Sequence, residues 1–198
     1  MPVKKIVPNE RPKISESAAL QHLLRHGIEI GQGVATSAGV MREPLALLGL
    51  RGYYARTLGE TPANERNIYD DCLIVISPNV FAAFNANTDP SITRKGMACL
   101  VPGEYRYTLG THNGTKAQYK AVIQLGQVTV VRDGLGVDRD APPARRFGIN
   151  IHKGGFTNTS SEGCQTIYPD QWASFLALVT QEARRYGAKD FPYVLIEV

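Results

Sequence analysis

The chain has few cysteines and no long apolar run. Its 198 residues include only Cys72, Cys99 and Cys164, and no two of them have the Cys-x-x-Cys spacing of a zinc or redox site. An odd number of cysteines at irregular spacing does not make a disulfide framework. No segment approaches the roughly 20 apolar residues that cross a bilayer, so we expect no membrane span.

Runs of Lys or Arg are also absent, although the net charge is +4. Without an Arg-rich helix or a zinc-finger spacing, we expect no nucleic-acid partner. A mild positive charge suits an anionic surrounding such as a cell wall, and it is equally typical of an ordinary basic surface. The first residues, MPVKKIVPNERPK, are not followed by an apolar stretch of signal-peptide length. We therefore expect synthesis in the cytoplasm, with another route to any target outside it.

The chain does contain many short segments rich in β-branched and aromatic residues. Turn signals such as Asn113-Gly114 and Asp133-Gly134 separate them. This pattern predicts a mainly β (α+β) fold, a β-sandwich or barrel. The predicted strands lie within residues 68–77, 80–87, 96–110, 119–134, 146–155 and 193–198.

Two segments have helical periodicity. Ser15 is a predicted N-cap for a short helix that ends near Gly27. A long helix is expected over Pro169–Tyr186, with Gly187 as its end. Residues 28–45 read as a loop, and a short apolar stretch follows it. We expect a single domain over 1–198, in which residues 1–67 form a tail, the short helix and loops packed on a core of residues 68–198.

The stretch 147–168, FGINIHKGGFTNTSSEGCQTIY, carries the candidate chemistry. Cys72 and Cys99 lie in apolar strand-like runs, where a free cysteine is usually a small buried hydrophobe. Cys164 lies in a polar turn instead, and His152 is at the end of a predicted strand twelve residues earlier. An imidazole that takes the thiol proton makes cysteine a nucleophile for acyl transfer, and an imidazolium lowers the thiol pKa.

Gly163 and Ser161 are candidates to shape the site around Cys164. A glycine has no Cβ, so its own N–H and that of Cys164 are free to point at an oxyanion. A serine hydroxyl in this turn can bond His152 or the loop backbone. The alternative is a polar hairpin in which the cysteine and the histidine never meet.

These residues resemble the catalytic domain of the L,D-transpeptidases. The likeness is carried by Ile151-His152, Gly154-Gly155, Ser161-Glu162-Gly163-Cys164 and the helix that follows. It is strong over residues 147–168 and weaker over the rest of 70–180. The resemblance implies an L,D-transpeptidase-like β-sandwich or barrel with a long helix after the cysteine loop. It also implies Cys164 as nucleophile, His152 as base, and Ser161 and Gly163 at the oxyanion site.

The resemblance implies a peptidoglycan stem peptide as substrate and no cofactor or metal. The chain departs from the family pattern at Glu162, where a His or basic residue is common, and at Gln165-Thr166, which replaces an aliphatic-Arg pair. Groups that remain to contact the stem peptide or its carboxylates are Arg145, Arg146, Lys153, Arg132, Glu162 and His112. Each of the basic ones can equally be a solvated charge, and His112 a turn residue.

Three functions remain open from the sequence. The first is a cysteine-dependent peptidoglycan hydrolase of the endolysin type, since the wording of the motif also resembles small proteins of tailed bacteriophages. In that case a holin or the virion delivers it to the cell wall or periplasm. The second is a cross-linking L,D-transpeptidase, which shares the acyl-enzyme step. The third is a non-catalytic virion or cell-wall-binding β domain of the same fold.

Overall fold

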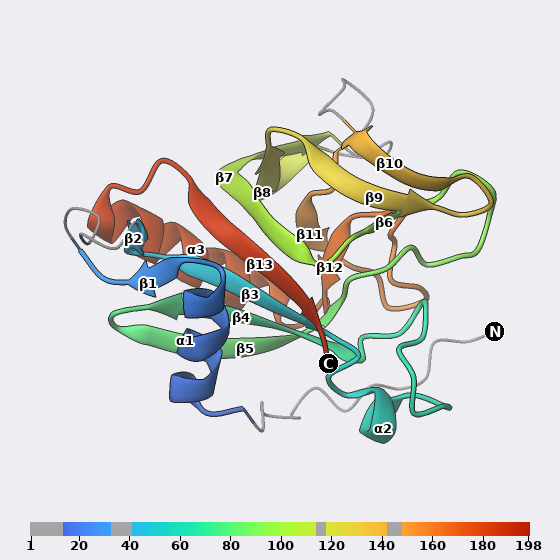
Figure 1. The fold of residues 1–198 in the computed structure, drawn as a ribbon, viewed down its shortest axis with the longest axis horizontal. Coiled ribbons are helices and arrows are strands. Elements are labelled where there is room, and N and C mark those ends of the chain that lie inside the picture. Colours follow the sequence, from blue (N-terminus) through green and yellow to red (C-terminus); the bar gives the residue numbers. More distant parts are fainter. Residues whose placement is uncertain (1–13, 33–40, 114–117, 142–147) are drawn as a thin grey trace.

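The computed structural model describes residues 14–32, 41–113, 118–141 and 148–198 (Figure 1). Eight strands form a closed barrel in the order β11-β12-β5-β4-β3-β13-β7-β8, and β10-β9-β6 and β1-β2 form two smaller sheets. The mainly β (α+β) class expected from the sequence is confirmed. The elements are α1 Glu16–Arg25, β1 Ile28–Ile30, β2 Met41–Glu43, β3 Ala46–Arg51, α2 Ala55–Leu58, β4 Asp71–Ser77, β5 Val80–Asn87, β6 Ala98–Leu100, β7 Gly103–Asn113, β8 Gln118–Leu125, β9 Val128–Arg132, β10 Gly136–Ala141, β11 Ile151–Lys153, β12 Gln165–Ile167, α3 Trp172–Tyr186 and β13 Phe191–Glu197.

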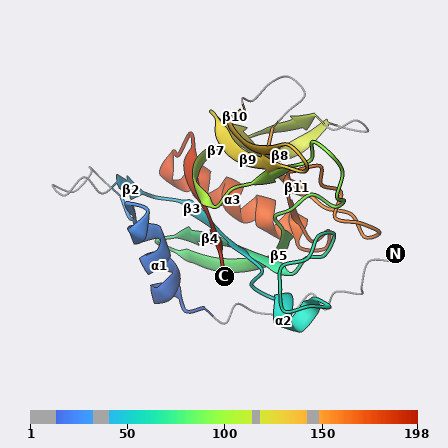
Figure 2. The same cartoon turned by 45° about the vertical axis from the view of Figure 1, so that its right-hand side comes forward.

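Strands β3 and β4 are buried on both faces. Leu47 and Leu73 point into the larger apolar cluster, which includes the core face of α3. Leu48 and Ile74 point into a second cluster, which is closed by α1. The two helices therefore lie on opposite sides of these strands (Figures 1 and 2). A strand covered on both faces reads as a continuous apolar run, without alternation.

Both predicted helices are present. Helix α1 begins where it was predicted, and α3 begins later in the sequence than predicted. The Oγ of Ser15 accepts the N–H of Ala18 at 3.2 Å and caps α1 as expected. Helix α3 begins at Trp172, and Pro169 lies in the turn before it. Gly187 ends α3 in the left-handed region, at φ 65°, where a residue without Cβ is favoured.

The N-terminal third contributes more than tail, helix and loops. Residues 28–45 were expected to be a loop, but β1 and β2 form a short parallel pair there. The apolar stretch that follows is β3, which pairs with β13 on one side and β4 on the other. The barrel core therefore begins before residue 68. In the described part of the chain, no helix combines the length and apolarity that a membrane crossing requires.

Candidate functional site

His152 and Cys164 lie on or next to neighbouring parallel strands. In the register of β11 and β12, Ile151 is opposite Gln165 and His152 is opposite Thr166. Cys164 directly precedes β12, so the predicted nucleophile and base lie on or next to adjacent strands. Among the described residues, the thiol contacts the Gly148 carbonyl and the imidazole contacts Lys153, Tyr119 and His112, and the two groups are not bonded to each other.

The His152 ring is buried, and its tautomer follows from its contacts. Its Nδ1 lies 2.8 Å from the backbone carbonyl oxygen of Lys153 and 3.2 Å from the Tyr119 hydroxyl. A carbonyl only accepts, so Nδ1 carries the proton and Nε2 is the bare, basic nitrogen. Burial, with a smaller contribution from His112, lowers the pKa of His152 to about 4, against the raising effect of the Lys153 carbonyl. The ring is therefore neutral at physiological pH.

Cys164 is half-buried, and its thiol has a partner other than His152. The Sγ donates to the backbone carbonyl oxygen of Gly148 at 3.2 Å. Burial raises the pKa of the thiol to about 11, the Asn150 backbone N–H opposes this rise, and the Glu162 carboxylate adds to it. The expectation of a thiol whose pKa is lowered by an imidazolium is therefore wrong for this resting state. Both groups are neutral.

The Tyr119 side chain interacts with both His152 and Cys164, in different ways. A thiolate at Cys164 raises the pKa of Tyr119, after the larger effect of burial, so the sulfur lies within electrostatic reach of that hydroxyl. The same hydroxyl contacts the His152 ring. Tyr119 therefore contacts the imidazole directly and interacts with Cys164 through charge alone.

The predicted role of Gly163 in an oxyanion site needs correction. Its N–H is not free, because it donates to the Oγ of Ser161 at 3.0 Å. The Ser161 hydroxyl in turn donates to the Cys164 carbonyl oxygen at 2.7 Å. The backbone of Gly163 has φ 144°, and a Cβ there would lie 2.6 Å from the Ala98 carbonyl oxygen of β6. Glycine is therefore required for close approach, and Ser161 shapes the turn around the cysteine, as expected.

The loop before Cys164 is anchored by residues that the sequence did not single out. The N–H of Ser161 donates to the Ser91 hydroxyl at 2.7 Å, and the N–H of Ser91 returns a bond to the Ser161 carbonyl at 2.8 Å. The Ser91 hydroxyl also lies 2.7 Å from that of Thr159, whose N–H donates to Asn67 Oδ1. The dipeptide Asp89-Pro90, which favours a turn, directly precedes Ser91, but no local pattern indicates the contact of Ser91 with Ser161. These bonds hold the loop in one shape before any ligand arrives.

The charged residues predicted to bind substrate differ in their exposure and in their ion-pair partners. Lys153 is exposed, and its side chain extends from the strand that carries His152. The Glu162 side chain is 82% exposed and lies 3.4 Å from Arg94. Arg132 is occupied, because it pairs with Asp138 at 2.9 Å on the three-stranded sheet.

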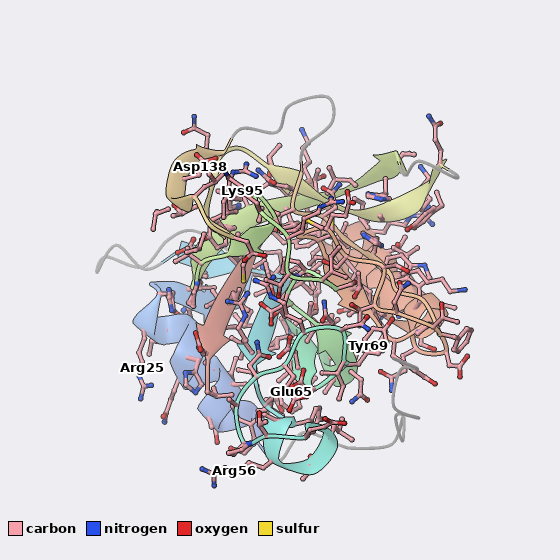
Figure 3. All side chains as sticks on the ribbon, turned by 90° about the vertical axis from the view of Figure 1, so that its right-hand side faces the viewer. Arg25, Arg56, Glu65, Tyr69, Lys95 and Asp138 are labelled. Carbon is pink, nitrogen blue, oxygen red and sulfur yellow. The ribbon has the colours of Figure 1, made fainter. Side chains whose placement is uncertain are left out.

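Figure 3 shows Asp138 well apart from Tyr69, whose hydroxyl donates to the Gly155 carbonyl in the loop before Cys164. Arg132 itself lies opposite Ala98 in the register of β9 and β6, and the Ala98 carbonyl oxygen is the atom closest to a Cβ placed at Gly163, so the backbone of Arg132 is near the turn that carries Cys164 while its side chain is paired with Asp138. The remaining candidates, Arg145 and Arg146, lie outside the described residues.

His112 lies in strand β7 and not in a turn. Its ring is stacked on that of His152, with the centroids 4.4 Å apart. The sequence suggested that this residue lines the cleft, but it gave no reason for a contact with the other histidine, because the two are forty positions apart.

Cys99 differs from the expected buried hydrophobe. Cys72 is fully buried as predicted, whereas Cys99 is half-buried and its thiol donates to Asp89 Oδ1 at 2.9 Å. A groove of about 690 Å³ runs along α3, and none of its lining residues is a predicted site residue. Within residues 14–32, 41–113, 118–141 and 148–198, no group of three His, Cys, Asp or Glu side chains is arranged to hold a metal ion.

Comparisons with models of protein families, with curated proteins and with solved structures gave no match.

Proposed function

We propose that the chain is a cysteine-dependent acyl-transfer enzyme that acts on peptidoglycan stem peptides, with hydrolysis as its main outcome. One observation carries the proposal: the half-buried thiol of Cys164 directly precedes β12, which pairs in parallel with β11, the strand that carries an imidazole of fixed tautomer. The bare Nε2 of His152 is the nitrogen that a general base needs. The resemblance over residues 147–168 supplies the substrate class.

The reaction starts from two neutral groups. The Cys164 thiol leaves the Gly148 carbonyl, its proton passes to His152 Nε2, and the sulfur attacks the carbonyl carbon of the scissile bond. The imidazolium that forms is stabilised by the Lys153 carbonyl, to which its Nδ1–H already donates. The Asn150 backbone N–H stabilises negative charge on the sulfur. Proton transfer thus accompanies the attack instead of preceding it.

The second half of the reaction returns both groups to their starting state. His152 gives its proton to the leaving amine, which departs and leaves a thioester on Cys164. Water, deprotonated by His152, then releases the acid and regenerates the thiol. An amine in place of water gives a cross-linked product, which is the alternative activity for the same site. Lys153 is exposed at the end of the strand that carries His152, and its charge is the group that we assign to a stem-peptide carboxylate.

The test compares release of soluble peptide from purified sacculi by wild type, Cys164→Ala and Cys99→Ala. We expect Cys164→Ala to abolish release and Cys99→Ala to keep it, because only Cys164 is next to a strand that pairs with the strand of His152. An added D-amino acid separates the two outcomes, since exchange products indicate transfer and shortened peptides indicate hydrolysis. Release by Cys164→Ala at the wild-type rate would overturn the proposal.

A second candidate function is a non-catalytic cell-wall-binding domain of this fold. The observation in its favour is the resting thiol, which is bonded to Gly148 and has a raised pKa. A co-sedimentation assay with sacculi decides between the two. Binding by wild type and Cys164→Ala alike, without release of peptide by either, supports this second function.

A further inference from the structure

The two histidine rings near Cys164 lie face to face. His112 of β7 and His152 of β11 stack with an interplanar angle of 23° and a centroid distance of 4.4 Å. Tyr119 lies opposite His112 in the register of β7 and β8, and its hydroxyl contacts His152 Nδ1. One face of the His152 ring is thus covered by His112, and its Nδ1 edge by Tyr119 and the Lys153 carbonyl.

Asn150 fixes the protonation of His112. The Oδ1 of Asn150 accepts the Gln124 backbone N–H at 3.0 Å, so its amide NH₂ is the group that faces His112. This NH₂ donates to His112 Nδ1 at 3.2 Å. His112 is therefore neutral, with its proton on Nε2, whereas His152 carries its proton on Nδ1. The stacked rings have opposite tautomers.

A charge on His112 would be unfavourable in this arrangement. Burial lowers the pKa of His112, and His112 in turn lowers the pKa of His152. If His112 Nδ1 took up a proton, its N–H would face the Asn150 NH₂, which is also a donor. The resulting cation would lie against the face of the His152 ring. The other titratable group in contact with the His152 ring is Tyr119, which is neutral at physiological pH, and the exposed Lys153 follows His152 on its own strand.

We propose that His112 is a positioning residue, which holds the His152 ring in the plane and tautomer that leave Nε2 free for the Cys164 proton. Without the stack, the imidazole can turn about its Cβ–Cγ bond and exchange its two nitrogens. The effect on rate rests on the proposed function, whereas the effect on the His152 tautomer does not.

The experiment uses the full chain as wild type, His112→Phe, His112→Gln and His26→Phe. Phenylalanine keeps an aromatic face but cannot accept from Asn150, and glutamine keeps an acceptor but has no ring face. His26, at the end of α1, is the control for loss of a histidine elsewhere. Circular dichroism establishes which variants fold. Long-range ¹H–¹⁵N spectra of the imidazoles give the tautomer and titration of His152, and peptide release gives kcat and KM.

In wild type we expect His152 as the Nδ1–H tautomer. In at least one folded His112 variant we expect mixed tautomers, a higher titration midpoint, and a kcat lower by roughly 10- to 100-fold, with KM little changed. The His26 control should match wild type. Unchanged His152 tautomer and titration in both folded His112 variants would overturn the positioning role. If wild type releases no peptide, the proposed function fails, but the spectra still decide what His112 does.

Discussion

The half-buried thiols of Cys164 and Cys99 donate to different kinds of acceptor. Burial raises the pKa of both, to about 11 and about 12. Cys99 donates to the carboxylate of Asp89, so loss of its proton would set two negative charges side by side. Cys164 donates to a neutral carbonyl and faces a backbone N–H donor. The neighbours, more than the depth of burial, distinguish the two thiols, and the proposed function assigns the reaction to Cys164 alone.

The largest effect is expected from the base. His152→Gln removes the nitrogen that accepts the thiol proton, and we expect peptide release to fall by about 10²- to 10⁴-fold. The matched control is His22→Gln on α1, which should release peptide as wild type does. If His152→Gln releases peptide at the wild-type rate, His152 is not the base for Cys164. The two thiols then do not differ in having a base.

Gly163→Ala tests the backbone that presents Cys164. A Cβ at φ 144° meets the Ala98 carbonyl oxygen at 2.6 Å, so the turn must move. We expect the free energy of unfolding in urea to fall by roughly 1–3 kcal/mol, together with a loss of release. In Gly31→Ala, the new Cβ comes no closer than 3.8 Å to the Arg42 side chain, and stability should hold. Equal stability of the two variants would contradict the close approach of β6 to the turn.

Alkylation by iodoacetamide sharpens the comparison of the thiols. Only the thiolate reacts, and both pKa values are raised, so the rate at Cys164 should still be rising at about pH 10. Cys99 should react more slowly than Cys164 at each pH, because a carboxylate opposes its ionisation. Peptide mapping by mass spectrometry measures the two rates separately. A plateau for Cys164 near neutral pH would show a resting ion pair with His152 and contradict the neutral pair.

The smallest effect concerns the acidic surroundings of Cys99. Burial raises the pKa of Asp70, and Asp71 raises it further, against the Glu65 backbone N–H. A carboxyl whose pKa is higher in the folded state stabilises that state below the unfolded pKa of about 4 and loses this stabilisation as pH rises through the folded value. The free energy of unfolding should therefore decline from about pH 4 through neutrality.

Asp70→Asn removes this dependence, because asparagine keeps an oxygen for the Glu65 N–H and carries no charge. We expect the variant to be more stable than wild type at about pH 8.5, by on the order of 1–2 kcal/mol, and to differ less from it at acid pH. Thermal unfolding across pH measures both. Parallel curves for the two proteins would mean that Asp70 does not titrate with folding.

Local signals made much of the fold predictable. The Ser15 cap, the strand over 80–87 and the end of α3 at Gly187 each depend on residues close in sequence, and all are present. Strand β3 was missed although β4, equally buried on both faces, was predicted, because β4 contains the β-branched residues that favour a strand whereas β3 is made mainly of leucine and alanine. Its parallel pairing with β13 joins opposite ends of the chain, and no local pattern encodes that.

The candidate site also combines features that local sequence predicts with contacts between distant strands that it does not predict. Cys164 and His152 come to adjacent strands because a single loop joins β11 to β12, so their spacing was informative. The partner of the thiol, Gly148, and the stack of His112 on His152 depend on how distant strands meet. Gly163 shows the limit of reasoning from residue type. The absence of a Cβ was recognised, but the reason for it is the Ala98 carbonyl and not a free N–H.

The most direct measurement is the intact mass of the protein mixed with a stem-peptide substrate and quenched in acid during turnover. A thioester on Cys164 adds the mass of the acyl fragment, and hydroxylamine removes it. The account predicts this adduct in wild type and in Cys99→Ala, and its absence in Cys164→Ala. Peptide release by wild type with no adduct at any time, or an adduct that persists in Cys164→Ala, would contradict acyl transfer through this thiol.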